Sequence, residues 1–296
     1  MQHYVPRFYL QNFAIDPDLD SPQVYCFDKP NQNHFPVSTT NIAGENYFYD
    51  LPEDEEQEFE HGLANIEGEF SRAYDDLLSH RDLDSLDEND RSAIAYSVAV
   101  QELRTRETRE KHREVISGLR QVLEEENLSE ELEEEMEELR QADSEEGANR
   151  MQIELIIERG WEFAEHVLAL KWVLIENETG HPFWTSDHPI VRYNSNDSGP
   201  YGNLGLRNRG IQIYFPLSPT VSLGFVDPDS FANCPRHLVI QDDEDGHEHI
   251  KLQNGLQMQF STRHVISNSN DFSMAHDFLD QFPEYADTNR QRVDIS

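Results

Sequence analysis

The spacing of apolar residues changes its period near residue 170, and this change constrains the fold more than any other feature of the sequence. In the segment 55–78 the apolar side chains recur every three or four positions, as on one face of a helix. They are Phe59, Leu63, Ile66, Phe70, Tyr74 and Leu77. After residue 170, short apolar runs broken by Gly, Pro, Asn and Asp are typical of strands. The sequence therefore predicts an α+β fold with short N-terminal strands, a long helical middle and a C-terminal, mostly antiparallel sheet.

Further helices are expected at about 87–123 and 149–170, with a last one from about residue 270. The opening segment is too short to form a core of its own, so we expect a single interwoven domain over residues 1–296. The stretch 124–147 is the most acidic part of the chain, and like charges four positions apart repel on a helix. We expect it to be an acidic, solvent-exposed insertion.

The chain carries 59 acidic and 23 basic residues, a formal net charge of −36. Acid-rich, lysine-poor surfaces suit concentrated salt, where a Debye length of roughly 3 Å at 1 M screens the repulsion between carboxylates. The composition is therefore typical of a halophilic protein, and screened charge does not exclude a nucleic-acid partner. Two cysteines provide no disulfide framework, and no apolar run has the length of a membrane span. We expect a cytoplasmic protein with no membrane partner.

Four short motifs contain most of the residues suited to chemistry. They are "HYVPRFYLQNF" at 3–13, "QELRT" at 101–105, "FWTSDHP" at 183–189 and "FPLSP" at 215–219. In this order the motifs resemble the family catalogued as domain of unknown function 4238, and the resemblance spans most of the chain. It implies no defined activity, so the interpretation of the site depends on the residues themselves.

The third motif offers hydroxyls from Thr185 and Ser186, a carboxylate from Asp187, and the imidazole of His188. Pro189 keeps His188 out of the helical region, and polar groups at the end of an apolar strand tend to project into a cleft. These four residues are candidate site residues. The alternative is a turn in which Asp187 only caps the backbone.

The first two motifs supply the other candidates. His3 is a candidate acid or base, or a metal ligand, and the resemblance associates it with Asp187. Arg7 and Arg104 are suited to carboxylate or phosphate, and Gln101 shares a helical face with Arg104. The alternative for each arginine is an ion pair with a nearby acid.

Weaker signals lie elsewhere in the chain. Glu67 lies beside Gly68, which weakens the helix by about 1 kcal/mol, and is a candidate third acid or base. His247 and His249 would share one side of a strand, but an acidic turn explains that segment better. The Gly- and Asn-rich segment 186–210 is interpreted as a loop that could cover a cleft beside Asp187.

Three hypotheses for function follow. The leading one is a hydrolase of phosphodiester or nucleotide substrates, with Asp187, His3 and Glu67 as catalytic groups and a divalent metal left open as cofactor. Its binding residues would be Arg7, Gln101, Arg104, Thr185, Ser186 and His188. The second is a non-catalytic nucleotide or anion sensor. The third is a structural or interaction protein whose motif residues form a buried polar network.

Overall fold

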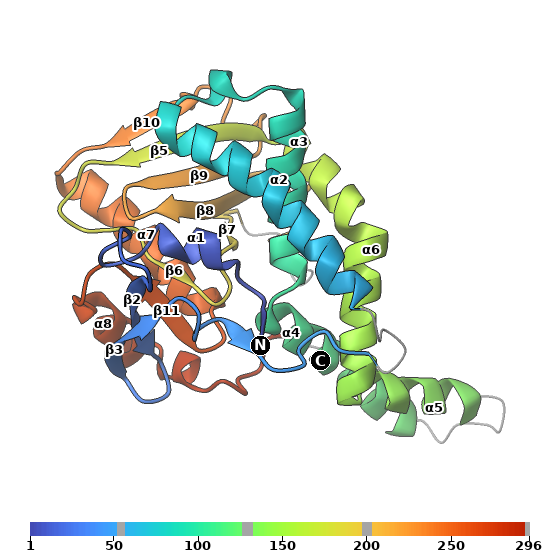
Figure 1. Cartoon of the computed structure of the whole chain (residues 1–296). Helices are drawn as coiled ribbons and strands as arrows, with labels where there is room; N and C mark the ends of the chain where they lie inside the picture. The colour runs from blue at the N-terminus through green and yellow to red at the C-terminus, as the bar shows by residue number, and fades with distance from the viewer. Residues whose placement is uncertain (52–56, 126–132, 197–202, 294–296) are drawn as a thin grey trace.

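The computed structural model describes residues 1–51, 57–125, 133–196 and 203–293 (Figure 1). It confirms the predicted α+β class: short strands come first, helices fill the middle, and a mostly antiparallel sheet follows. The helices of this part of the chain are α1 (Arg7–Gln11), α2 (Glu58–His80), α3 (Glu88–Leu103), α4 (Arg106–Glu125), α5 (Glu133–Ala142), α6 (Glu145–Ala169), α7 (Glu244–Phe260) and α8 (Ser273–Gln281).

The larger sheet has five strands, and helices cover both of its faces. Its order is β10 (His237–Ile240), β5 (Lys171–Asn177), β9 (Val221–Val226), β8 (Gln212–Ser218) and β7 (Val191–Tyr193), antiparallel except for the parallel pair β10 and β5. Along β5, Trp172 and Leu174 face the core under α2 and α3, whereas Val173 and Ile175 face the core under α7. This alternation buries both faces of a strand whose apolar run is nearly continuous.

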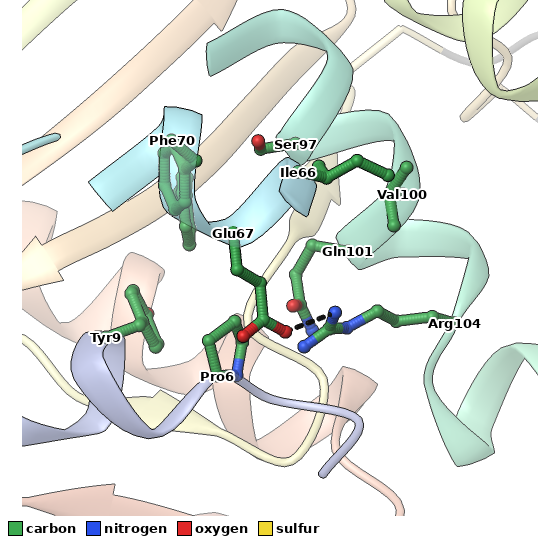
Figure 2. A pocket seen from close by; sticks show the side chains of 10 residues that line it. Pro6, Tyr9, Ile66, Glu67, Phe70, Ser97, Val100, Gln101 and Arg104 are labelled. Carbon is green, nitrogen blue, oxygen red and sulfur yellow. Dashed lines mark hydrogen bonds and ion pairs between the residues drawn. The ribbon is translucent and has the colours of Figure 1, made fainter. Parts of the chain in front are cut away.

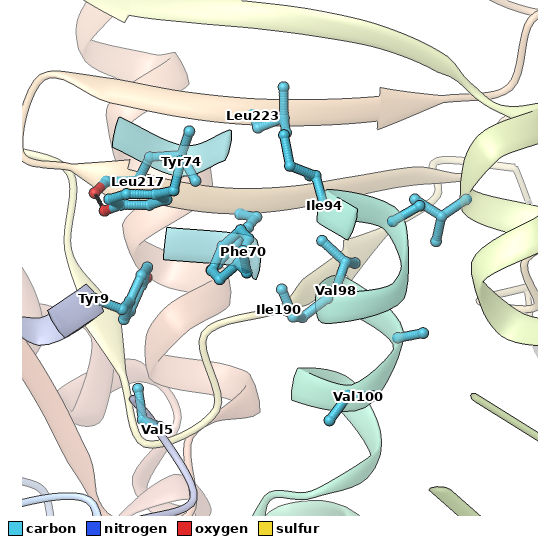
Figure 3. Close-up of a cluster of buried hydrophobic side chains, with 14 of the residues drawn as sticks. Val5, Tyr9, Phe70, Tyr74, Ile94, Val98, Val100, Ile190, Leu217 and Leu223 are labelled. Carbon is cyan, nitrogen blue, oxygen red and sulfur yellow. Dashed lines mark hydrogen bonds between the residues drawn. The ribbon is translucent and has the colours of Figure 1, made fainter. Parts of the chain in front are cut away.

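The main core lies between the five-stranded sheet and the helical pair α2 and α3 (Figure 3). This core contains Phe70 and Tyr74 from α2, and Ile94 and Val98 from α3. Phe70 and Tyr74 belong to the buried face that the sequence periodicity predicts for α2. The first helix of the chain, α1, adds Tyr9 to the same core. The helical middle therefore packs directly on the C-terminal sheet.

The smaller sheet joins the two ends of the chain. Its order is β3 (Asn33–Ser38), β2 (Gln23–Asp28), β11 (His264–Ser267) and β6 (Thr185–Ser186), all antiparallel. A separate pair joins β1 (Gln2–His3) to β4 (Gly44–Glu45). N-terminal β2 thus pairs with β11, and β11 in turn pairs with the strand that carries the third motif.

One long helix was expected at about 87–123, but the chain breaks it between α3 and α4 at Arg104 and Thr105. The carbonyls freed by the break find partners far along the chain: Gln152 Nε2 on α6 donates to those of Leu103 and Thr105, both at 2.9 Å. Thr108 Oγ1 donates to the Glu102 carbonyl at 2.6 Å. Because the amide that satisfies these carbonyls comes from α6, the residues around the break do not themselves predict that the helix ends there.

Helix α7 is the largest element that the sequence analysis missed, because the segment around His247 and His249 was interpreted as an acidic turn. Asp243 caps the helix by accepting a hydrogen bond from the Gly246 N–H at 2.9 Å. Its buried face carries amides as well as apolar groups, so the helical stripe is interrupted in the sequence. Asn254, for example, accepts from the Trp184 N–H at 2.8 Å and donates to the Pro182 carbonyl at 3.0 Å.

Part of the acidic stretch 124–147 falls at 126–132, outside the described residues. The rest ends α4, forms α5 and begins α6, and α5 packs against both neighbouring helices. In Figure 1, α5 lies at the lower right, away from the two sheets.

Candidate functional site

Asp187 follows β6 and lies in the interior, where it is only 3% exposed. Its Oδ1 accepts a hydrogen bond from the Thr262 N–H, and its Oδ2 accepts from the N–H groups of Arg263 and His264, all at 2.8 Å. These three donors lie on the segment that leaves α7 and enters β11. Asp187 thus caps a backbone segment, as in the alternative considered for it, but that segment is 75 residues or more away rather than in the local turn.

The two hydroxyls before Asp187 are also buried and hydrogen-bonded. Thr185 Oγ1 lies 2.6 Å from Tyr9 Oη, which also lies 2.6 Å from the Pro216 carbonyl. A carbonyl only accepts, so Tyr9 donates its single proton to Pro216 and accepts from Thr185. Ser186 Oγ lies 2.6 Å from Gln257 Oε1 on α7. The first, third and fourth motifs are therefore joined through one phenol.

The first and second motifs meet at the carbonyl of Tyr4. Gln101 Nε2 donates to this oxygen at 2.8 Å and Arg104 Nε donates at 2.9 Å, so the two side chains do converge on one group. That group is the protein's own backbone. Arg104, 2% exposed, also pairs through Nη1 with Glu67 Oε1 at 2.8 Å, as Figure 2 shows.

A small cavity lies beside this contact, lined by α1, α2, α3 and β8 (Figure 2). The space open to the centre of a water molecule is ≈ 10 Å³, about what one ordered water requires. Ser97 Oγ and Arg104 Nη2 belong to residues that line it, and both atoms are buried with no hydrogen-bond partner in the described chain. A single water has the size and the bonding capacity for this place, whereas a nucleotide does not fit without movement of the walls.

His188 is fully buried and joins the second motif to the third. Its Nδ1 lies 2.6 Å from Thr105 Oγ1, and its Nε2 lies 3.7 Å from Glu102 Oε2. Glu102 also pairs through Oε1 with Arg192 at 2.9 Å. Burial lowers the pKa of His188 to about 3, and the nearby charge of Lys111 acts in the same direction. The imidazole is therefore neutral near pH 7.

His3 and Arg7 lie apart from these contacts. His3 Nε2 donates to the Thr40 carbonyl at 3.2 Å, and burial lowers the pKa of His3, an effect that this hydrogen bond only partly offsets. Arg7 is exposed at the start of α1. Within the described residues no hydrogen bond or ion pair connects His3 or Arg7 to Asp187. The proposed His3–Asp187 pair is therefore not joined by contacts of the described residues, and Asp187 is 3% exposed. Residues 197–202 of the loop expected to cover a cleft beside Asp187 lie outside the described residues.

We call the contacts that connect the four motifs, together with the backbone hydrogen bonds that Asp187 accepts, the motif clasp. Its members are Tyr4, Tyr9, Gln101, Arg104, Thr105, Thr185, Asp187 and His188. The sequence analysis singled out five of them and missed the roles of Tyr4, Tyr9 and Thr105. All three lie inside the quoted motifs, so the signal was present, but a tyrosine in an aromatic segment first suggests core packing.

The described residues contain no group of three or more His, Cys, Asp or Glu side chains arranged to hold a metal ion. In the same part of the chain, no helix is both long and apolar enough to cross a membrane. Comparison with curated proteins and with solved structures finds no match. A match to a described family, in contrast, covers residues 1–271, most of the chain and all four motifs. The chain therefore belongs to the family described as "Protein of unknown function (DUF4238)".

Proposed function

We propose that this protein acts by binding a partner, and that its motif residues are an internal clasp rather than a catalytic centre. The observation that carries the proposal is the environment of Asp187: both carboxylate oxygens accept backbone hydrogen bonds, and the residue is 3% exposed. An acid or base must come within hydrogen-bond reach of its substrate. Both oxygens of Asp187 are bound to the segment that connects α7 to β11, so a substrate would have to compete with these hydrogen bonds.

Arg104 and Gln101 support the same interpretation. Gln101 Nε2 and Arg104 Nε donate to the Tyr4 carbonyl, and Arg104 Nη1 donates to Glu67. A phosphate that took these three donors would displace contacts that hold the N-terminal segment against α3. A buried guanidinium that loses its partners costs several kcal/mol, on the order of 3–5. The clasp is thus better suited to fixing the fold than to releasing and rebinding a ligand.

A hydrolase is the second candidate, favoured by one arrangement of three residues. Thr105, His188 and Glu102 form a hydroxyl–imidazole–carboxylate series, the order of groups found where a base activates a nucleophile. Against it, Thr105 and His188 are fully buried. A substrate would therefore reach Thr105 only after the side chains around it had moved.

An activity screen on purified protein tests both candidates. Transfer RNA, single- and double-stranded DNA and nucleotides are offered with Mg²⁺, Mn²⁺ or EDTA, at low and at molar KCl. The variants are Asp187→Asn and Thr105→Val, with Asp280→Asn on the exposed face of α8 as a matched control. We expect no turnover, and lowered melting temperatures for the two clasp variants alone. Turnover that either clasp variant abolishes without a change in melting temperature would overturn the proposal in favour of the hydrolase.

We further propose a halophilic, cytoplasmic setting. The net charge of −36 supports the first, and the two free cysteines, Cys26 and Cys234, are in keeping with a reducing compartment. Nucleotides or nucleic acids stay among the proposed partners because molar salt removes most of the repulsion from the acidic surface.

A further inference from the structure

An open hollow lies beside the loop that follows β7, away from the motif clasp. Its volume is ≈ 760 Å³, within the range of pockets that hold small ligands. Its lining includes Arg207, Asn208 and Arg209 from the loop before β8, and Phe231 from the turn after β9. We call it the arginine hollow; no residue of the motif clasp lines it.

The two arginines are unusual because this chain supplies acidic partners almost everywhere else. Elsewhere an exposed arginine typically pairs with a carboxylate, as Arg81 does with Glu176 at 2.6 Å and Arg106 with Glu45 at 2.9 Å. Arg207 and Arg209 are both exposed, and in the described part of the chain neither guanidinium has a hydrogen bond or an ion pair.

Two acids near the hollow, Glu162 and Asp227, already have other donors. The charge of Arg207 is felt by Glu162, but that carboxylate pairs with Arg159 at 2.6 Å. Asp227 accepts from the Gly210 N–H at 2.8 Å and from Ser230 Oγ at 2.6 Å, and these hydrogen bonds hold the pKa of its carboxyl low against the effect of burial. Neither of these two carboxylates therefore pairs directly with Arg207 or Arg209.

The backbone that carries the arginines is held in place by asparagines. The amide of Asn194 donates to the Arg209 carbonyl at 3.0 Å, and that of Asn196 donates to the same oxygen at 2.9 Å. Gly210 follows with φ +83, and a Cβ there would come within 2.2 Å of Asn196 Nδ2. Only glycine fits this left-handed position, so the local sequence fixes where the arginine-bearing segment lies.

We propose that the arginine hollow binds the phosphate group of a small phosphate monoester. Guanidinium groups match phosphate oxygens with paired N–H donors. Both Arg207 and Arg209 line the hollow, so it offers two positive charges to a doubly charged anion. Asn208, whose side chain has no hydrogen-bond partner among the described residues, adds an amide donor to the wall. Phe231, which is partly buried, provides an apolar surface for the organic part of the ligand.

Calorimetric titration of the whole protein tests the proposal, with inorganic phosphate, adenosine monophosphate and adenosine as probes. Arg207→Gln and Arg209→Gln remove one guanidinium each, and Phe231→Ala removes the apolar wall. Arg72→Gln is the matched control, because Arg72 is 68% exposed on α2 and makes only a 3.6 Å pair with Asp90. Melting temperatures of all variants establish that each one folds.

We expect saturable one-to-one binding of phosphate or the nucleotide. Arg207→Gln and Arg209→Gln should each weaken this binding about tenfold, and Arg72→Gln should weaken it less than about twofold. Binding should also weaken as KCl rises from about 0.1 M to about 1 M. A preference for the nucleotide that Phe231→Ala abolishes identifies a nucleotide ligand; equal binding of both probes identifies phosphate alone. The proposal is wrong if neither probe saturates a site by about 10 mM, if both arginine variants bind as well as wild type, or if adenosine binds as tightly as its monophosphate. The clasp is untouched by these variants, so this test and the activity screen fail separately.

Discussion

Replacement of Asp187 by asparagine isolates the contribution of one carboxylate to the fold. The amide is nearly isosteric, so packing is preserved, but one of its two terminal atoms becomes a donor. If Oδ1 of the new side chain takes the place that faces Arg263 and His264, its amide nitrogen faces the Thr262 N–H, and two donors meet. The opposite orientation leaves two N–H groups facing a donor, so the first is favoured.

The expected loss follows from these contacts. One buried N–H without a partner costs about 1–3 kcal/mol, and two hydrogen bonds change from charge-assisted to neutral, at about 0.5–1 kcal/mol each. The total is about 3 kcal/mol. For a chain of this size, 1 kcal/mol corresponds to about 2–4 °C in melting temperature, so Asp187→Asn should lower it by about 6–12 °C.

The assay is thermal unfolding followed by circular dichroism, at fixed KCl, with Asp280→Asn as the control. Asp280 lies exposed on α8, so its replacement changes net charge equally and should shift melting by less than about 2 °C. A shift for Asp187→Asn as small as that of the control would refute the reasoning. In that case the three backbone hydrogen bonds would contribute nothing measurable to folding, and the clasp would lose its main support.

Four further outcomes are expected. Tyr9→Phe leaves the Pro216 carbonyl without its donor and should cost about 1–3 kcal/mol in urea unfolding; an unchanged midpoint contradicts the bond. Glu67→Gln should cost only about 1–2 kcal/mol although it breaks the pair with Arg104, because the Glu67 side chain is 31% exposed and water replaces part of the interaction; a loss above about 4 kcal/mol would show that solvent does not compensate. The pKa of His188 is about 3 when folded and 6.5 when unfolded, so below pH 6.5 the unfolded chain binds a proton that the folded chain does not. The free energy of unfolding should therefore fall as the pH falls from about 6.5 to about 3, by up to about 1.4 kcal/mol per pH unit. An identical pH dependence in His188→Asn would show that His188 is not its cause. Finally, the unfolding midpoint should rise with KCl, since screening reduces repulsion within a chain of net charge −36; a midpoint independent of KCl would remove the halophilic interpretation.

The fold class was predictable because periodicity survives wherever a helix or strand buries one apolar face. Helix α2 and strands β5, β8 and β9 follow such patterns, and the structure contains them. Helix α7 was not predictable in this way because Gln253, Asn254 and Gln257 occupy its buried face. Their partners are groups on β9 and on the segment around β6, so the polarity that hid the helix makes sense only after the chain has folded.

In the candidate site, residue type indicated side chains that make buried hydrogen bonds, but it did not predict their partners. Asp187, Arg104 and Gln101 were predicted as catalytic or binding residues, and in the structure each makes buried hydrogen bonds. Their partners were not predictable, because the Tyr4 carbonyl and the N–H groups of residues 262–264 are backbone atoms that every sequence possesses. Composition cannot distinguish a carboxylate that activates water from one that caps a distant strand.

This distinction bears on where function should be sought. Each polar member of the clasp lies in the interior, where loss of a hydrogen-bond partner costs about 1–3 kcal/mol. The contacts between the N-terminal segment, α3 and the sheets therefore depend on these residues, whichever ligand the protein binds. In this proposal the four motifs contain the residues that hold the fold together. Exposed groups such as Arg207 and Arg209 carry no such structural demand, because removing either breaks no ion pair or hydrogen bond of its guanidinium within the described residues. In a chain with so many acids, cations left unpaired at a hollow are a more direct indication of a binding site than the motifs themselves.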